Sequence, residues 1–284
     1  MPKSIAVMRF PIESQSHKYN LIHFRFFIQY AKIAGVEIEM VKSDDNVFLS
    51  NDQLIFSCTI DGQQIIVDYA DHSTKNWKKF YPRIPYYKFQ TTRETSQDII
   101  PLGPPMVGVK RIGTKGATMR EYNHIRYHYN YQPGIKILCK QLPNGAAVER
   151  RNMVHQMLKD NFSDVDINAN ENQIDFWKAH EHCLAAVCVP GATNHMVDRG
   201  HIELIGLGVC TVSPRLSTLF PGRRELEAGK HYIQCADDYH NLVPILKDLK
   251  NNPDVCKTVG NEAHKFYEES YSPTYYWKWI LENL

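Results

Sequence analysis

The order of apolar and polar positions at the start of the chain predicts a strand, a loop, a helix and a second strand. Residues 5–10 form a short apolar run, and residues 11–19 form a polar stretch. Residues 21–34 carry apolar side chains at helical spacing and end at Gly35, and residues 36–41 form another apolar run. Short apolar runs favour strands, and a 3.6-residue repeat ended by glycine favours a helix. This order is typical of the opening of a parallel α/β unit.

Two further apolar runs, residues 53–60 and 63–69, are joined by Asp61 and Gly62. An Asp-Gly pair in this position favours a hairpin, although two strands around a tight turn fit the pattern equally well. Residues 81–133 are irregular and rich in proline, glycine and tyrosine. Because such a stretch is typical of loops and junctions, we place the end of a first domain there.

The second half of the chain alternates more regularly between strand and helix patterns. Strands are expected at 135–139, 164–167, 183–189 and 209–212, and helices at 148–158, 174–182 and 199–205. Three more helices are expected at 241–250, 253–269 and 271–284. The last of them contains Tyr275, Tyr276, Trp277 and Trp279, which are too apolar together to be left in water.

Two such units in one chain predict an α/β protein of two Rossmann-like domains that face a central cleft. We expect an N-terminal domain at residues 1–130 and a second domain at residues 131–265. The final helix, residues 266–284, is expected to pack back on the first domain. A chain of 284 residues is long enough for two cores of ordinary size.

Composition narrows the class of protein. The formal net charge of +2 is too small for a non-specific nucleic-acid binder, so no nucleic-acid partner is expected. The seven cysteines are scattered and form no pair at metal-binding spacing, which favours buried reduced thiols. No apolar run reaches the length of a membrane span, and Arg9 interrupts the first run before a signal-peptide core forms. These features predict a cytoplasmic protein without an anchor.

The most informative stretch for function is residues 190–208, a glycine-containing loop that follows an apolar strand and leads into a helix. This arrangement places backbone N–H groups and the positive end of a helix where a phosphate can bind. Arg199 and Glu203 are four residues apart and therefore lie on one face of that helix. The arginine can hold a diphosphate and the carboxylate can accept hydrogen bonds from ribose hydroxyls. A surface ion pair of no functional importance has the same spacing.

The string Asp198-Arg-Gly-His-Ile-Glu-Leu-Ile-Gly-Leu-Gly-Val209, followed by a strand and Ser213-Pro214, resembles the donor-binding half of exostosin-like glycosyltransferases of the GT-B type. Residues 231–242 are similar to a late strand and helix of that family. The resemblance covers residues 135–284 and maps the family's R-x-x-x-E helix onto Arg199 and Glu203. It implies a nucleoside diphosphate sugar held by the second domain and a glycan acceptor held by the first. A uridine diphosphate sugar, with UDP-xylose as the first candidate, is the implied donor, and no other cofactor is implied.

Further candidates for donor binding lie in two loops. Arg150 and Arg151 begin the helix after the strand at 135–139, which is another position where a loop meets a phosphate. Thr193, Asn194 and His195 precede Arg199 and can reach the diphosphate or the base. Ordinary solvated side chains remain an alternative for each of them.

A general base close to the acceptor hydroxyl is required if the sugar is transferred with inversion, and a histidine or carboxylate serves. Asp71 and His72 follow the strand at 63–69, and Asp71 is the preferred base. Glu13 and His17, in the first strand-to-helix loop, form the other candidate pair. Solvated loop residues explain either pair equally well.

A metal-binding DxD motif has one literal match, Asp164-Val-Asp166, and its surroundings do not fit. We therefore expect a metal-independent enzyme in which arginines and helix N-termini neutralise the leaving diphosphate. Two other functions remain open. One is a sugar-nucleotide epimerase or hydrolase of the same fold, and the other is a non-catalytic carbohydrate- or nucleotide-binding protein.

Overall fold

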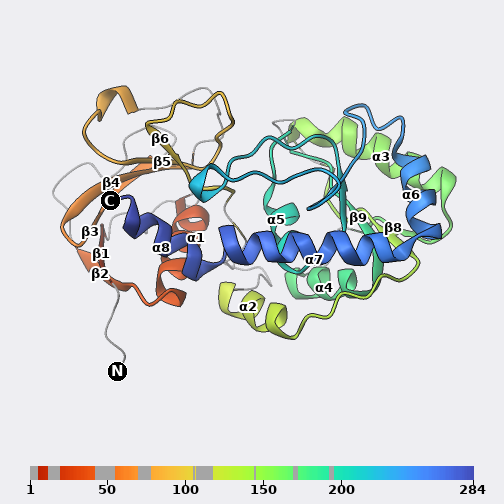
Figure 1. Ribbon diagram of the computed structural model, residues 1–284, viewed down its shortest axis with the longest axis horizontal. Coiled ribbons are helices and arrows are strands. Elements are labelled where there is room, and N and C mark those ends of the chain that lie inside the picture. The colour runs from red at the N-terminus through yellow and green to blue at the C-terminus, as the bar shows by residue number, and fades with distance from the viewer. Residues whose placement is uncertain are drawn as a thin grey trace.

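The structure is a computed structural model that contains two β-sheets, one in each half of the chain (Figure 1). It describes residues 6–11, 20–41, 55–69, 78–104, 106, 118–143, 145–168, 172–191 and 195–284. Both sheets are covered by helices, so the α/β class expected from the sequence is confirmed. Within the part of the chain that is described, no helix has both the length and the apolar composition needed to cross a bilayer.

The first sheet has six strands in the order β2-β1-β3-β4-β5-β6. Its elements are β1 (Val7–Pro11), α1 (Asn20–Ile33), β2 (Glu37–Val41), β3 (Ile55–Ile60), β4 (Gln63–Asp68), β5 (Tyr86–Lys88) and β6 (Ile99–Pro101). Strand β3 runs antiparallel to β1 and β4, whereas the other neighbouring pairs are parallel. The parallel pair of β1 and β2 around α1 matches the predicted opening unit. The sheet as a whole is mixed, unlike the all-parallel sheet of a Rossmann domain.

Strands β3 and β4 form the hairpin that was one of the two readings of the Asp-Gly pair. Asp61 and Gly62 both have positive φ angles, 47° and 87°, as a two-residue hairpin turn of this hand requires. The turn is also tied to β1, because the Val7 amide donates to the Asp61 carboxylate at 2.8 Å. The pair therefore fixes the register of three neighbouring strands.

The second sheet has five parallel strands in the order β8-β7-β9-β10-β11. Its strands are β7 (Lys136–Leu138), β8 (Val165–Asp166), β9 (Cys183–Val187), β10 (Thr211–Ser213) and β11 (Ile233–Gln234). The connecting helices are α3 (Val148–Asn161), α4 (Gln173–Ala179) and α5 (Arg199–Gly206), with short 3₁₀ turns η3 (Gly145–Ala147), η4 (His180–His182) and η5 (Pro221–Arg223). Numbered along the chain, the strand order is 2-1-3-4-5, that of a doubly wound sheet.

Three C-terminal helices, α6 (Leu242–Asn251), α7 (Pro253–Ser270) and α8 (Pro273–Glu282), complete the molecule. Helix α7 contacts α5 in the second half, whereas α8 contacts α1 in the first. Tyr276 and Trp277 on α8 are fully buried, and the Trp277 ring lies 4.8 Å from the ring of Phe27. The Tyr30 hydroxyl of α1 also lies 2.8 Å from the Tyr267 hydroxyl of α7. The end of the chain thus connects the two halves through a continuous aromatic core.

The junction predicted between residues 81 and 133 contains regular structure that the sequence did not reveal. Strands β5 and β6 lie there, as does α2 (Met119–His128), which begins with a capping box formed by Thr118 and Glu121. Tyr122 of α2 packs against Trp177 of α4, with ring centroids 5.0 Å apart. The helix therefore packs on a helix of the second half, although it precedes that half's sheet in the sequence.

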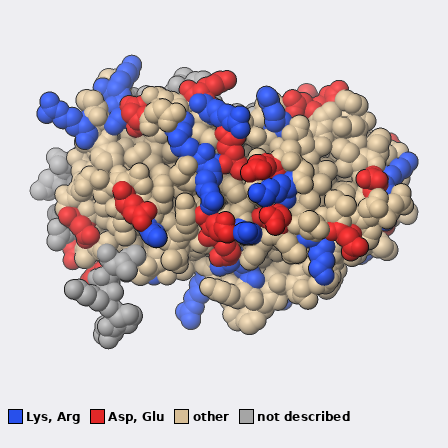
Figure 2. Space-filling model, in the orientation of Figure 1, with Lys and Arg blue, Asp and Glu red and all other residues tan. Residues whose placement is uncertain are grey.

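Charge is mixed over the surface of the molecule. Figure 2 shows basic and acidic side chains interspersed across the middle of one face, so this face has no extended field of one sign. The seven cysteines are buried and free, as the sequence predicted.

Candidate functional site

The edge of the second sheet where β7 and β9 end is the candidate functional site. After β7 the chain turns to β8 on one side, and after β9 it turns to β10 on the other side. Connections that leave neighbouring strands in opposite directions open a crevice, and α/β proteins bind ligands at this switch point. The predicted residues Arg150, Arg151, His195 and Arg199 all belong to the segments that follow these two strands.

Arg150 and Arg151 lie in the first turn of α3 and hold the backbone that follows β9. Arg150 Nη2 donates to the carbonyl oxygens of Pro190 at 2.9 Å and Gly191 at 2.5 Å. Arg151 Nη2 donates to the carbonyl of Val189 at 3.1 Å. Arg150 Nε is buried and has no hydrogen-bond partner among the described residues. Both positive charges are therefore fixed at the switch point, where they also shape the loop.

Asp198 occupies the N-terminus of α5, the helix end at which the sequence predicted that a phosphate binds. Its Oδ1 accepts from the His201 amide at 2.9 Å, and its Oδ2 accepts from Gln141 Nε2 at 2.6 Å. Burial raises the pKa of Asp198, against the opposing effects of the His201 amide and the Arg151 charge. A carboxylate at the N-cap already satisfies the first turn of the helix, so a second anion would be repelled there.

Helix α3 offers the more accessible anion site. Its N-cap residue is Ala147, which makes no side-chain capping bond. The 3₁₀ turn η3 leads directly into α3, and Glu149 lies in its first turn, so the positive end of this helix is shared between the chain itself and any anionic ligand. Arg150 and Arg151 lie on the same turn of α3. The positive end of the helix and the two arginine side chains therefore favour negative charge at the same place.

Arg199 and Glu203 are separated by burial, contrary to their predicted joint role. The Arg199 side chain is exposed, whereas Glu203 is 0% exposed. Glu203 Oε2 accepts hydrogen bonds from Gln173 Nε2 at 2.7 Å and Trp177 Nε1 at 2.9 Å. Helix α5 has eight residues, and all of them from His201 onwards are buried. Arg199 therefore lies at the exposed start of the helix, whereas Glu203, one turn later, lies in the interior. Glu203 therefore joins α5 to α4 and does not face a ribose.

His195 links the loops that follow β9, β10 and β11. Its Nδ1 lies 3.0 Å from the carbonyl oxygen of Arg215 and 3.7 Å from Asp237 Oδ1. A carbonyl can only accept, so Nδ1 carries the proton in this hydrogen bond and Nε2 is left as the acceptor. Thr193 and Asn194, the neighbouring candidates, lie outside the described residues.

Tyr239 is a residue of this site that the sequence did not single out. Its hydroxyl is buried and has no hydrogen-bond partner within the described parts of the chain. Burial raises the pKa of Tyr239, and the charge of Arg150 acts in the opposite direction. Tyr239 and His195 both have positive φ angles, 64° and 69°. Such backbone strain concentrates at functional sites, but neither a hydrophobic pattern nor a motif marks it in a sequence.

We call this group of residues the switch-point site. It consists of Gln141, Arg150, Arg151, His195, Asp198 and Tyr239. It combines two fixed positive charges, of which that of Arg151 is paired with the Asp198 carboxylate at 3.4 Å, an imidazole, and a buried hydroxyl that lacks a partner in the described chain. Such a set can hold a phosphate-containing ligand.

The first half presents its own strand ends near this region. Strands β1 and β4 run in the same direction, because each is antiparallel to β3. The base candidates Glu13 and His17 come after β1, and Asp71 and His72 come after β4, but all four lie outside the described residues.

One backbone–backbone hydrogen bond and one from a side chain to a carbonyl connect the segments that follow strands of the two sheets. The Leu219 amide, from the segment after β10, donates to the Thr91 carbonyl, from the segment after β5, at 2.9 Å. Arg223 Nη2 donates to the Thr95 carbonyl at 2.9 Å. The segments that follow these strands therefore lie beside the other half of the chain.

The DxD motif is used in two ion pairs. Lys250 Nζ lies 2.6 Å from Asp164 Oδ2, and Lys140 Nζ lies 2.6 Å from Asp166 Oδ2. Partial burial would raise the pKa of Asp166, but the hydrogen bonds from Lys140 and the Asn168 amide, together with the nearby lysine charges, lower the pKa overall. Both carboxylates are thus neutralised by lysines. In the described residues, no group of three or more histidine, cysteine or acidic side chains is placed to hold a metal ion.

The chain was compared with protein-family models and with curated proteins. No protein-family model matches the chain, and no curated protein is significantly similar to it.

Proposed function

We propose that the protein is a glycosyltransferase of the GT-B type that binds a nucleoside diphosphate sugar at the switch-point site. The observation that carries the proposal is the convergence of Arg150, Arg151 and the uncapped start of α3 on the switch point of a doubly wound sheet. A diphosphate carries the negative charge that this arrangement favours. The resemblance of residues 135–284 to exostosin-like transferases supports the same donor class.

The rest of the molecule is compatible with a two-domain transferase. Helix α8 returns to pack on α1, and the loops at the carboxyl ends of both sheets contact each other. A donor at the second sheet and an acceptor at the first would then meet at this contact. We propose the domain limits 1–130, 131–265 and 266–284 on this basis.

In the proposed reaction the arginines stabilise the negative charge that develops on the departing diphosphate. Arg150 and Arg151 are fixed by loop carbonyls and need little reorganisation, and the exposed Arg199 can approach from the rim. Asp71 remains the proposed base from the first half, and its partner in the reaction is a glycan hydroxyl. A divalent metal is not required, because the positive charge comes from side chains.

A transfer assay with a panel of sugar nucleotides tests this function. The purified chain is incubated with UDP-xylose, other UDP sugars and guanosine diphosphate sugars, with and without glycan acceptors, in the presence of EDTA. We expect acceptor-dependent release of UDP, and Asp71→Asn should reduce it by about two orders of magnitude while leaving UDP binding nearly intact.

The rival functions give different results in the same assay. Acceptor-independent release of UDP would identify a hydrolase, and conversion of the donor to its epimer would identify an epimerase. Binding without any turnover would identify a non-catalytic protein. Loss of turnover in EDTA that manganese restores would overturn the metal-independent mechanism.

A further inference from the structure

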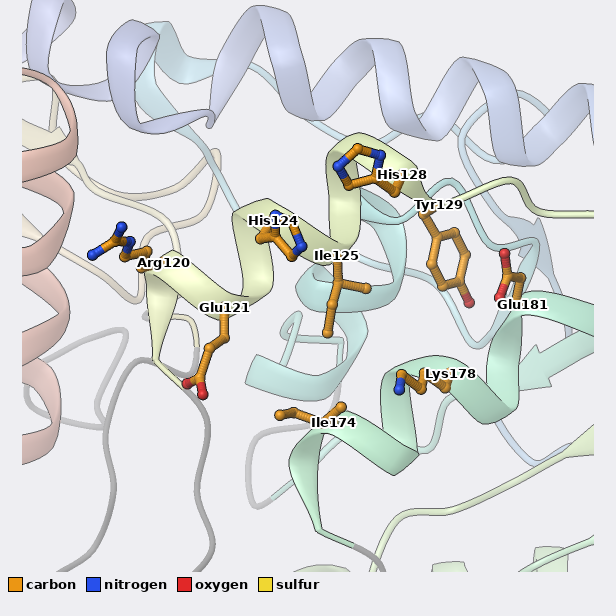
Figure 3. A pocket seen from close by; sticks show the side chains of 9 residues that line it. All are labelled: Arg120, Glu121, His124, Ile125, His128, Tyr129, Ile174, Lys178 and Glu181. Atoms are coloured by element: carbon orange, nitrogen blue, oxygen red, sulfur yellow. The ribbon is translucent and has the colours of Figure 1, made fainter.

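A cavity of about 640 Å³ lies between α2 and α4, away from the switch-point site (Figure 3). Helix α2 contributes Arg120, His124 and His128 at intervals of four residues, which form one stripe along the helix. Helix α4 contributes Ile174 and Lys178 from the opposite side. The volume lies in the range of small-molecule sites in proteins.

The charges that line this cavity balance one another. Arg120 and Lys178 are matched by Glu121 and Glu181. Glu121 Oε2 also accepts from the Thr118 amide at 2.6 Å, so one carboxylate is held at the start of α2. Apart from the imidazoles of His124 and His128, the cavity has equal numbers of acidic and basic side chains, and such a lining does not select a strongly charged ligand. It offers hydrogen-bond donors and acceptors side by side.

The floor of the cavity is apolar. Figure 3 shows Ile125 and Tyr129 pointing from α2 towards α4, where Ile174 lies. The Tyr129 hydroxyl donates to the Trp177 carbonyl at 2.9 Å, which fixes the ring between the two helices. Polar groups around an apolar floor suit a ligand that has both kinds of surface.

A second cavity, of about 320 Å³, adjoins the first, because Tyr129 lines both. It contains Tyr127, whose side chain is 79% exposed, and the amides of Asn130 and Asn261. The Arg126 guanidinium covers one face of the Tyr127 ring at 5.0 Å. A large aromatic side chain left this exposed beside a cavity is a common feature of binding surfaces.

From these observations we infer that the two cavities form one groove that binds a neutral oligosaccharide. Sugar hydroxyls both donate and accept hydrogen bonds, so they suit a lining in which four lysine and arginine side chains, three glutamates and three histidines offer donors and acceptors side by side. The apolar C–H faces of sugar rings pack on exposed tyrosine rings such as that of Tyr127. Two adjoining cavities fit a chain of sugar units better than a single one. The groove shares no residue with the switch-point site, and its binding does not require the transfer reaction.

An array of immobilised neutral and acidic glycans, probed with the labelled full-length chain, tests the inference. We expect at least one neutral oligosaccharide to bind, and its binding to persist in molar sodium chloride because no ion pair is involved. Tyr127→Ala should weaken that binding by about tenfold or more. Phe80→Ala is the matched control, since Phe80 is also an exposed aromatic side chain, 58% accessible, but lies in the first half.

Three results would overturn the inference. They are an array without any bound glycan, binding confined to sulfated or phosphorylated glycans and lost in salt, and a Tyr127→Ala variant that binds as the wild type does. The proposed function fails independently of the groove. Absence of UDP binding would contradict the proposed transferase function without affecting the groove. The Arg150→Ala substitution lies outside the groove and should leave binding of the glycan unchanged.

Discussion

At the scale of single residues, burial decides which candidates can touch a ligand. Spacing alone put Arg199 and Glu203 on one helix face, but only Arg199 is exposed, and Glu203 binds Trp177 in the interior. Conversely, Tyr239 gave no signal in the sequence because a buried hydroxyl without a partner in the described chain is a property of the folded molecule. The sequence could therefore predict the charged loops of the site, Arg150 included, but not the depth at which each side chain lies.

The contrast between Arg199 and Glu203 gives a first prediction. Arg199→Ala should leave stability unchanged and weaken binding of a UDP sugar by about 1.5–3 kcal/mol, the usual contribution of a hydrogen bond to a charged group. Glu203→Ala should lower the free energy of unfolding by at least about 2 kcal/mol, because Gln173 and Trp177 lose their buried acceptor and a cavity remains. Denaturant unfolding and calorimetry on both variants check these outcomes. Equal effects of the two substitutions on binding would restore the joint role of the pair.

The Tyr239 hydroxyl gives a second prediction. Since this group has no hydrogen-bond partner in the described chain, Tyr239→Phe should leave the unfolding free energy unchanged or slightly higher. If a phosphate or sugar oxygen is its partner, the same substitution should weaken UDP-sugar binding several-fold. Tyr232→Phe serves as a control, because the Tyr232 hydroxyl accepts from the Leu216 amide at 3.1 Å and its loss should cost stability. Full-strength ligand binding by Tyr239→Phe would exclude Tyr239 from the site.

At the scale of elements, prediction from the sequence succeeded where apolar runs were long and bounded by glycine or proline. Strand β9 and the parallel pair of β1 and β2 around α1 are examples. It failed for β5 and β6, because these three-residue strands lie in the stretch 81–133, whose proline and glycine content favours loops. Helix α2 was also missed, since its ten residues include several charged and polar side chains and its buried stripe is narrow. The close packing of α5 against α7 was not predicted from the sequence either.

The crossing of α5 and α7 depends on two glycines, which gives a third prediction. A Cβ atom built on Gly260 would lie 2.0 Å from the carbonyl oxygen of Gly208, so any larger side chain forces the elements apart. Gly260→Ala should therefore destabilise the fold by about 1–3 kcal/mol despite the better helix propensity of alanine. Asn261→Ala, at the neighbouring exposed position of α7, is the control. Thermal unfolding of the two variants compares them, and an unchanged melting temperature for Gly260→Ala would contradict the close approach.

At the scale of the whole molecule, the two halves act as one folded unit through α7, α8 and the aromatic core around Tyr30. The strand order of the second sheet placed the switch point where the sequence expected a ligand, because parallel α/β connections allow few arrangements. The mixed order of the first sheet was not predictable, since the direction of β3 depends on a single turn. The chemistry of the first half also depends on loops outside the described residues.

Two buried histidines contribute to the response of the whole fold to acid, which gives a fourth prediction. Burial lowers the pKa of His180 to about 4 and that of His201 to about 3, from an ordinary value near 6.5. The unfolded chain therefore binds protons that the folded chain excludes, so stability is full above about pH 6.5 and falls as the pH is lowered towards 4. The loss should reach on the order of 1–2 kcal/mol per histidine near pH 5.

Urea unfolding between pH 7.5 and pH 5 measures this loss. The pH dependence should become shallower in a His180→Gln variant, which has one fewer buried group to protonate. A flat stability profile over the same range would show that these imidazoles accept protons in the folded state.

Calorimetric titration with UDP tests the central claim most directly, on the wild type, Arg150→Ala and Lys159→Ala. Arg150 lies at the start of α3 by the switch point, whereas Lys159 is an exposed cation in the last turn of the same helix, so each variant removes one positive charge. The wild type and Lys159→Ala should bind UDP equally, and Arg150→Ala should bind it at least about tenfold more weakly. Absence of UDP binding by the wild type, or equal affinity of all three proteins, would contradict a nucleotide site at the switch point.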